Sequence, residues 1–259
     1  NVQTLVPATF ARLPQPDGSR RFSDRDPVGR VAALILDRAL DFEIQHYRDY
    51  RSTMRQSVTD RFLGGRGTAW VRYEPHIKAG AVQQGPEGDQ ITEDVSEPAE
   101  ELDYECAPVD YVHWKDFGHT VARTWEEVTA VWRKVYMTRK ACEARFGKAE
   151  GGKIPLDASP EDLKRDDRSN TEGQDHQRAC VYEIWDKENE EALWISKSMK
   201  QILDRKADPL ELEDFFPCPQ PLFATMTNDS LIPVPDFTLY QDQANELDIA
   251  ADRIDGLLK

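Results

Sequence analysis

The sequence has few basic residues for its number of acidic ones: its 259 residues include 33 Lys and Arg against 48 Asp and Glu, a net charge of −15. Proteins that grip a nucleic-acid backbone normally gather Lys and Arg on one surface, so this excess of acid argues against a DNA-reading module. No apolar run approaches the roughly 20 residues that a membrane-spanning helix needs, and the N-terminus does not have the basic-then-apolar order of a secretory signal. We therefore expect no membrane partner.

Cysteine and the common catalytic motifs are also scarce or missing. The four cysteines form no close C-x₂-C pair of the kind that holds structural zinc, so we expect buried, reduced thiols in an intracellular protein. The sequence contains no G-x-x-x-x-G-K-[ST], no G-x-G-x-x-G after a strand and no G-x-S-x-G. With 39% hydrophobic residues the chain can still build a core. This combination favours a structural or assembly protein without a cofactor, and not an enzyme.

A long helix is predicted near the beginning of the chain, after an irregular lead-in over residues 1–26. Asp26 is a suitable N-cap, and Pro27 occupies the favoured first helical position. Apolar residues then recur at steps of three, four or seven, which predicts a helix over residues 27–63 with one apolar stripe. Gly64 marks its end.

A second helix is predicted over residues 236–259, with Asp236 as its cap. Its apolar positions recur up to the last residue, and no C-cap closes it. Because Asn1 is also not a methionine, we expect the sequence to be a piece of a longer protein.

Between the two helices, residues 27–235 form an expected α+β region in which the long helix packs with antiparallel strands and hairpins. Residues 79–105 carry nine acids and no Lys or Arg, which predicts a mobile acidic excursion, and residues 147–177 read as a polar loop. Alternating or β-branched segments predict strands, the clearest being a hairpin. These segments are residues 68–73, 102–106, 109–114 and 128–137, and the hairpin of residues 181–185 with 192–195. Trp70 and Trp185 are expected in the core.

Three clusters could carry chemistry, and each has a plainer interpretation. His113, Asp116 and His119 form an H-x₂-D-x₂-H run that could bind iron or zinc, or could be an ordinary polar strand end. Glu183, Asp186 and Lys187 could suggest a metal-dependent nuclease, or only a charged hairpin turn. The residues 64–67, Gly-Gly-Arg-Gly, lie between a helix and a strand, the reverse of the order that cradles phosphate, so a turn is favoured.

Arginines also recur along the predicted long helix. Such a row is typical of a solvated or partner-facing side, with phosphate tracking as the alternative. The positions are Arg48, Arg51, Arg55 and Arg61.

Eight segments occur in a fixed order along the chain. They are NVQTLVP (1–7), FSDRDPV (22–28), FLGGRGTAWVRY (62–73), DYVHWKDF (110–117), VYEIWDK (181–187), FFPCP (215–219), IPVPDF (232–237) and YQDQANE (240–246). This ordered series resembles the N-terminal half of portal proteins from tailed double-stranded DNA bacteriophages. The series covers essentially the whole chain, and its specificity lies in the order of the segments because no single motif is a fingerprint.

The resemblance implies a subunit of a ring, usually of twelve copies, at one vertex of the virion capsid, made in the host bacterial cytoplasm. Double-stranded DNA would pass through the ring without sequence-specific binding during packaging and ejection. The implied partners are further copies of the chain, major capsid and scaffolding proteins, terminase and head-tail adaptor proteins. By order along the chain, residues 27–235 would form the wing and residues 236–259 the start of a stem helix.

Two other functions stay open from the sequence. The first is a metal-dependent enzyme that uses His113, Asp116 and His119 or the Glu183 region. The second is an unrelated adaptor or scaffold protein that docks through its long helix. The sequence assigns no catalytic, cofactor-binding, metal or DNA-channel residues.

Overall fold

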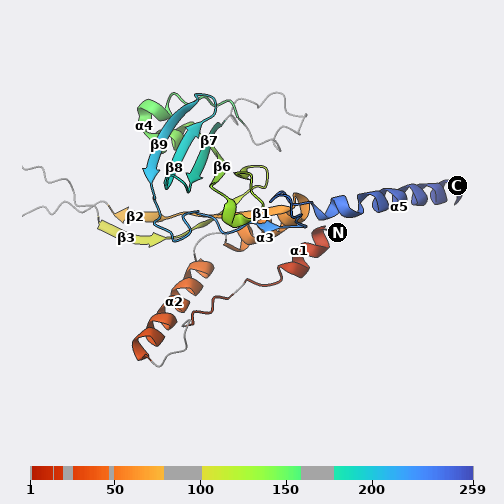
Figure 1. Cartoon of the computed structure of the whole chain (residues 1–259), viewed down its shortest axis with the longest axis horizontal. Coiled ribbons are helices and arrows are strands. Elements are labelled where there is room, and N and C mark those ends of the chain that lie inside the picture. The colour runs from red at the N-terminus through yellow and green to blue at the C-terminus, as the bar shows by residue number, and fades with distance from the viewer. Residues whose placement is uncertain are drawn as a thin grey trace, which may run out of the picture. The chain divides into compact units, whose positions relative to one another are not determined.

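The structure is a computed structural model that describes residues 2–13, 15–19, 26–46, 50–78, 101–158 and 178–258 (Figure 1). Helices and antiparallel sheets both contribute, which confirms the α+β class. The chain forms two compact units. Unit 1 comprises Asn1–Ala11, Ser52–Trp70 and Tyr111–Lys259, and unit 2 comprises Arg12–Arg51 and Val71–Asp110. Both units are assembled from separated stretches of chain.

Five α-helices and one short 3₁₀ helix are described. They are α1 (Val2–Thr9), α2 (Pro27–His46), α3 (Tyr50–Leu63), η1 (Trp125–Glu127), α4 (Arg139–Gly151) and α5 (Asp236–Leu258). The prediction of an irregular lead-in is wrong for α1, where Val6 is buried. That tertiary contact stabilises a short helix that sequence propensity alone does not indicate.

The predicted helix over residues 27–63 is described as two helices, α2 and α3, and residues 47–49 between them lie outside the described residues. The predicted apolar stripe is also wrong for α3, because its buried side chains are Thr53, Ser57 and Asp60. Strand β1 (Arg66–Val71) approaches this face so closely that a Cβ on Gly67 would lie 1.9 Å from the Ser57 carbonyl oxygen. Only small or hydrogen-bonding side chains fit at that spacing.

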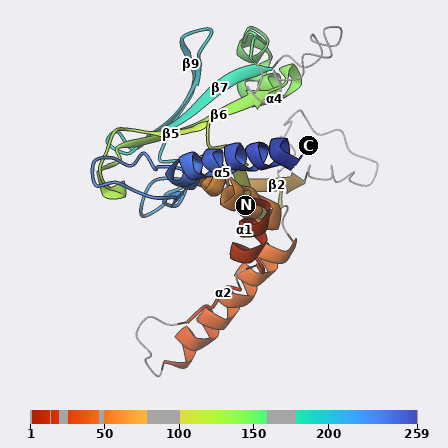
Figure 2. The same cartoon turned by 90° about the vertical axis from the view of Figure 1, so that its right-hand side faces the viewer.

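The strands form three sheets. They are β1, β2 (Glu74–Lys78), β3 (Glu101–Cys106), β4 (Val109–Val112), β5 (Phe117–His119), β6 (Ala130–Met137), β7 (Ala179–Asp186), β8 (Glu191–Ser196), β9 (Gln201–Ala207) and β10 (Leu222–Phe223). The sheet orders are β10-β1-β4, β2-β3 and β5-β6-β7-β8-β9. Helix α4 contacts β9 of the five-stranded sheet, of which β5, β6, β7 and β9 are labelled in Figure 2.

The predicted hairpin is confirmed as β7 and β8, paired from Asp186↔Glu191 to Val181↔Ser196. Alternate residues of β7 are buried, as expected for a strand with one face on a core. The turn is stabilised by Asp186, whose Oδ1 accepts hydrogen bonds from the backbone N–H groups of Glu188 and Asn189. The Asp186 side chain therefore stabilises the turn between β7 and β8.

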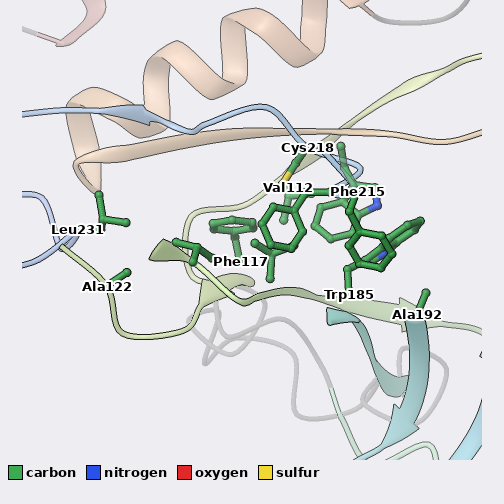
Figure 3. Packing of buried hydrophobic residues seen from close by; sticks show 12 residues of the cluster. Val112, Phe117, Ala122, Trp185, Ala192, Phe215, Cys218 and Leu231 are labelled. Atoms are coloured by element: carbon green, nitrogen blue, oxygen red, sulfur yellow. The ribbon is translucent and has the colours of Figure 1, made fainter. Parts of the chain in front are cut away.

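The main core of unit 1 gathers buried residues from the five-stranded sheet and from segments before and after it in the chain. Trp70 is completely buried and Trp185 is 3% exposed, which confirms both as core residues. In Figure 3 the rings of Phe117, Trp185 and Phe215 lie together, and the Trp185 and Phe215 centroids are 5.5 Å apart. Aromatic side chains thus supply most of the apolar volume of this core.

Much of the predicted acidic excursion, residues 79–100, and of the predicted polar loop, residues 159–177, lies outside the described residues. The rest of the excursion belongs to β3, which pairs with β2. The loop prediction is wrong for residues 147–151, which continue α4 beyond a break at Gly147 (φ 81°). Arg139 holds this last turn by donating hydrogen bonds to the carbonyls of Gly151 and Gly152.

Candidate functional site

In the Gly-Gly-Arg-Gly segment, Gly64 and Gly65 form the turn after α3, and Arg66 and Gly67 begin β1. Gly65 has φ +80°, a conformation that favours glycine, and its carbonyl accepts a hydrogen bond from Ala224 N–H at 2.8 Å. The Arg66 guanidinium donates to the carbonyls of Trp114 and Phe117, at 2.8 and 2.7 Å, and lies 5.0 Å from the Phe117 ring centroid. Arg66 is thus engaged by the protein itself, as the turn interpretation predicts and a phosphate cradle does not.

Asp60, near the end of α3, holds the segment that contains Tyr111 and Trp114. Its carboxylate accepts hydrogen bonds from the Tyr111 hydroxyl at 2.6 Å and from the Trp114 N–H at 3.0 Å. Asp60 is not among the candidate residues that the sequence indicated. The signal that was available is the polar spacing Thr53, Ser57, Asp60, which places three small or hydrogen-bonding side chains on one helix face.

The histidine run follows β4 and extends through β5. The Asp116 carboxylate accepts a hydrogen bond from the Tyr136 hydroxyl at 3.2 Å and lies 3.8 Å from the Lys134 ammonium nitrogen. The His119 Nδ1 lies 2.8 Å from the Thr120 carbonyl oxygen, and burial lowers the pKa of His119. Across the described ranges, no three His, Cys, Asp or Glu side chains are placed to hold a metal ion together. The geometry therefore fits the plainer interpretation of a polar strand end.

We expect the purified protein to carry no stoichiometric transition metal, and His113→Ala to leave its metal content unchanged. Asp116 is already occupied by Tyr136 and Lys134, so the run does not converge on one point. Elemental analysis by mass spectrometry after dialysis measures this. A molar equivalent of zinc or iron that disappears in His113→Ala would overturn the expectation and restore the metal-enzyme alternative.

The nuclease interpretation requires Glu183 and Asp186 to face one site, but residues three apart on a strand point to opposite faces. Glu183 is buried, and its carboxylate accepts hydrogen bonds from Arg133 Nε at 2.7 Å and Trp185 Nε1 at 3.1 Å. The Arg133 guanidinium in turn lies 4.7 Å from the Trp70 ring centroid. Glu183 therefore belongs to a buried polar cluster of the core, and Asp186 belongs to the turn.

The cysteines are free thiols. Cys106, Cys142 and Cys218 are buried and Cys180 is half-buried, so the expectation of buried thiols is confirmed for three of the four. Burial raises the pKa of Cys218 to about 12. That thiol stays protonated near neutral pH, which disfavours a nucleophilic role.

The arginine row is divided by the structure. Arg51 and Arg55 are exposed, Arg48 lies outside the described residues, and Arg61 forms an ion pair with Asp236. The Arg61–Asp236 pair joins the last turn of α3 to the first turn of α5 within unit 1. Asp236 thus forms an ion pair with Arg61. It also places a negative charge in the first turn of α5, where the helix dipole favours one.

The main unexplained feature is the exposed apolar surface on two helices. Helix α2 has no buried residue, and α5 is exposed over nearly its whole length. The exposed large apolar side chains are Val28, Val31, Leu34, Ile35, Leu36, Leu40 and Phe42 on α2, and Phe237, Leu239, Leu247, Ile249, Ile254 and Leu257 on α5. Surfaces of this kind mark interaction sites in soluble proteins. We therefore treat α2 and α5 as the candidate functional surfaces.

A scan against protein-family models finds no matching family, and a search of curated proteins finds no match for the chain. None of the described helices combines the length and hydropathy required to cross a membrane.

Proposed function

We propose that the chain is a subunit of a bacteriophage portal ring, the conduit at the capsid vertex through which double-stranded DNA is packaged and ejected. The ordered series of portal-like segments suggests this function. The structural observation that carries it is α5, a 23-residue helix that leaves its apolar side chains exposed. In the portal interpretation α5 is the start of the stem helix, which is covered by the stem helices of neighbouring subunits.

The spacing along α5 supports packing against other helices. Phe237, Tyr240, Ala244, Leu247, Ala251 and Ile254 follow one another at steps of three and four residues, the heptad pattern of helices that pack side by side. At 1.5 Å per residue the helix is about 34 Å long. A single exposed helix is marginal in water, so its stability must come from packing of this apolar seam.

The charge of α5 fits a wall along which DNA moves. Six of its residues are acidic, against a single arginine, Arg253; the acidic residues are Asp236, Asp242, Glu246, Asp248, Asp252 and Asp255. Lysine contacts to many phosphates would have to be released at every step of translocation, whereas an acidic surface holds DNA weakly. In this proposal ATP hydrolysis belongs to the separate terminase. The ring is the docking site for terminase and for the head-tail adaptor proteins.

Negative-stain electron microscopy of the purified protein tests the proposal. We expect ring-shaped particles with a central hole. Leu247→Asp, which places a charge in the α5 seam, is expected to abolish the rings, because the charge would be buried at every interface.

The matched control is Asn245→Asp, which adds the same charge on α5 outside the seam and is expected to leave the rings intact. Particles that never show a central hole, at any concentration at which the protein is soluble, would contradict the portal proposal and favour the adaptor or scaffold alternative.

A further inference from the structure

The chain that leads into α5 is held against the turn between α3 and β1. The Val234 N–H donates a hydrogen bond to the Thr225 carbonyl at 2.8 Å, so a β-bridge fixes the backbone just before the helix begins. The next residue, Pro235, has a restricted φ angle. A Cβ on Gly65 would lie 3.3 Å from Pro233 Cγ and 3.4 Å from Pro235 N, which shows how closely this segment follows the turn. The starting point of α5 is therefore well defined.

The rest of α5 is supported along one side at most. Among its described residues only Asp236, Tyr240 and Ala244 are half-buried, and every residue from Asn245 to Leu257 is exposed. Residues four apart lie above one another on a helix, so the protein covers one side of the first three turns and nothing beyond them. A helix that is supported only at its beginning has its direction set there.

Arg61 makes the charged contact at this end of α5. Its guanidinium donates a hydrogen bond to the Asp236 carboxylate and lies 4.7 Å from the Phe62 ring centroid. Because the guanidinium stacks on a ring of α3, the ion pair ties the first turn of α5 to a side chain whose own position is restricted. The Arg61 and Asp236 side chains are 28% and 31% exposed, so salt ions can reach the pair and screen it.

We propose that Arg61 is a positioning residue that locks the direction of α5, with Pro235 and Asp236 as the pivot. With the ion pair formed, α5 leaves unit 1 in one direction. With the ion pair broken, α5 stays helical, because its backbone hydrogen bonds do not involve the Arg61 side chain. It then swings as a rigid body about its first turn, which is a hinge motion. Since salt screens an exposed ion pair, the lock responds to ionic strength.

This lock goes beyond the portal proposal and does not depend on it, because it concerns the two ends of one contact within a single chain. It is compatible with that proposal. In a closed ring every copy needs the same geometry, and a lock on α5 would give each copy the same helix direction.

Pulsed electron paramagnetic resonance between two spin labels on the 259-residue chain measures the direction of α5. One label is attached at Gly256→Cys, where a Cβ meets nothing within 4 Å, and the other at Lys206→Cys, an exposed position of β9 in the same unit. A Cys180→Ser background removes the half-buried thiol. Labelled protein is diluted with an excess of unlabelled protein, so that only distances within one chain are recorded.

We expect one narrow distance peak at low salt. Arg61→Gln should give a peak about twofold broader, because the helix then samples more directions. Raising NaCl to about 1 M, where the Debye length falls to about 3 Å, should broaden the peak of the chain that keeps Arg61 and leave the Arg61→Gln peak unchanged. The matched control Arg55→Gln removes an exposed arginine of the same helix and should keep the narrow peak.

Asp236→Asn breaks the same pair from the α5 side and should broaden the peak in the same way. It decides the question if circular dichroism shows that Arg61→Gln does not fold. Two results would overturn the lock: peaks as narrow in both variants as with the pair intact, or a peak that is already equally broad with the pair intact at low salt. Absence of rings together with a narrow peak that broadens in Arg61→Gln would contradict only the portal proposal.

Discussion

Replacing Glu183 by glutamine is expected to lower the free energy of unfolding by about 3 to 5 kcal/mol, the range for breaking a buried ion pair by removing one partner. The Arg133 and Glu183 side chains are 10% and 9% exposed, and Nε and Oε2 are 2.7 Å apart. Glutamine keeps the shape and the acceptor for Trp185 Nε1, so the loss reports the removal of the carboxylate charge beside the Arg133 guanidinium. Urea unfolding followed by tryptophan fluorescence measures the change.

The double variant Arg133→Met/Glu183→Gln provides the matched control. It removes both charges and leaves a polar acceptor for Trp185, so most of the lost stability should return. A double variant that is as unstable as Glu183→Gln would mean that packing of the Arg133 stem, and not the missing counter-charge, dominates the cost.

Trp70→Ala is expected to destabilise unit 1 by about 3 to 5 kcal/mol, as for other buried tryptophan truncations. The ring is completely buried, and the Arg133 guanidinium lies over it. The substitution therefore creates a cavity and also removes a cation–π contact from the buried ion pair. Differential scanning calorimetry should show a clear fall in the melting temperature.

Trp70→Phe separates the two effects. Phenylalanine keeps an aromatic face under Arg133 and fills more of the cavity, so it should cost less than Trp70→Ala. Melting temperatures unchanged in both variants would show that Trp70 does not contribute to the core as its burial indicates.

The strands were the most predictable part of the fold. The alternation of buried and half-buried side chains in β7 follows the residue pattern of the sequence, and Asp186 is a residue type that favours a turn. The helices were harder. A helical period shows that one face is apolar but not which face meets the protein, and in α3 the close approach of Gly67 selects the polar face with Ser57. Such a spacing depends on residues distant in sequence.

The chemistry of the candidate clusters was predicted in part. Their plainer interpretations could be stated from spacing alone, because residues three apart on a strand cannot share a face. The ion pair of Glu183 with Arg133 could not be predicted from the sequence, because these residues are 50 positions apart. They meet only through the β6–β7 register, Arg133↔Glu183. The exposed surfaces of α2 and α5 also needed the fold, because an apolar stripe looks the same in sequence whether its own chain or another covers it.

The two edge strands of the five-stranded sheet, β5 and β9, limit strand-to-strand association between copies of this chain. Unpaired strand edges invite uncontrolled addition of further strands, and natural proteins prevent this with short or charged edge strands. Here β5 has three residues, and β9 carries Asp204, Arg205 and Lys206 in succession. Asp204 is paired with Arg145 of α4, and Arg205 with Glu191 of β8. Both described edges thus resist strand addition, so uncontrolled association of copies through this sheet is disfavoured.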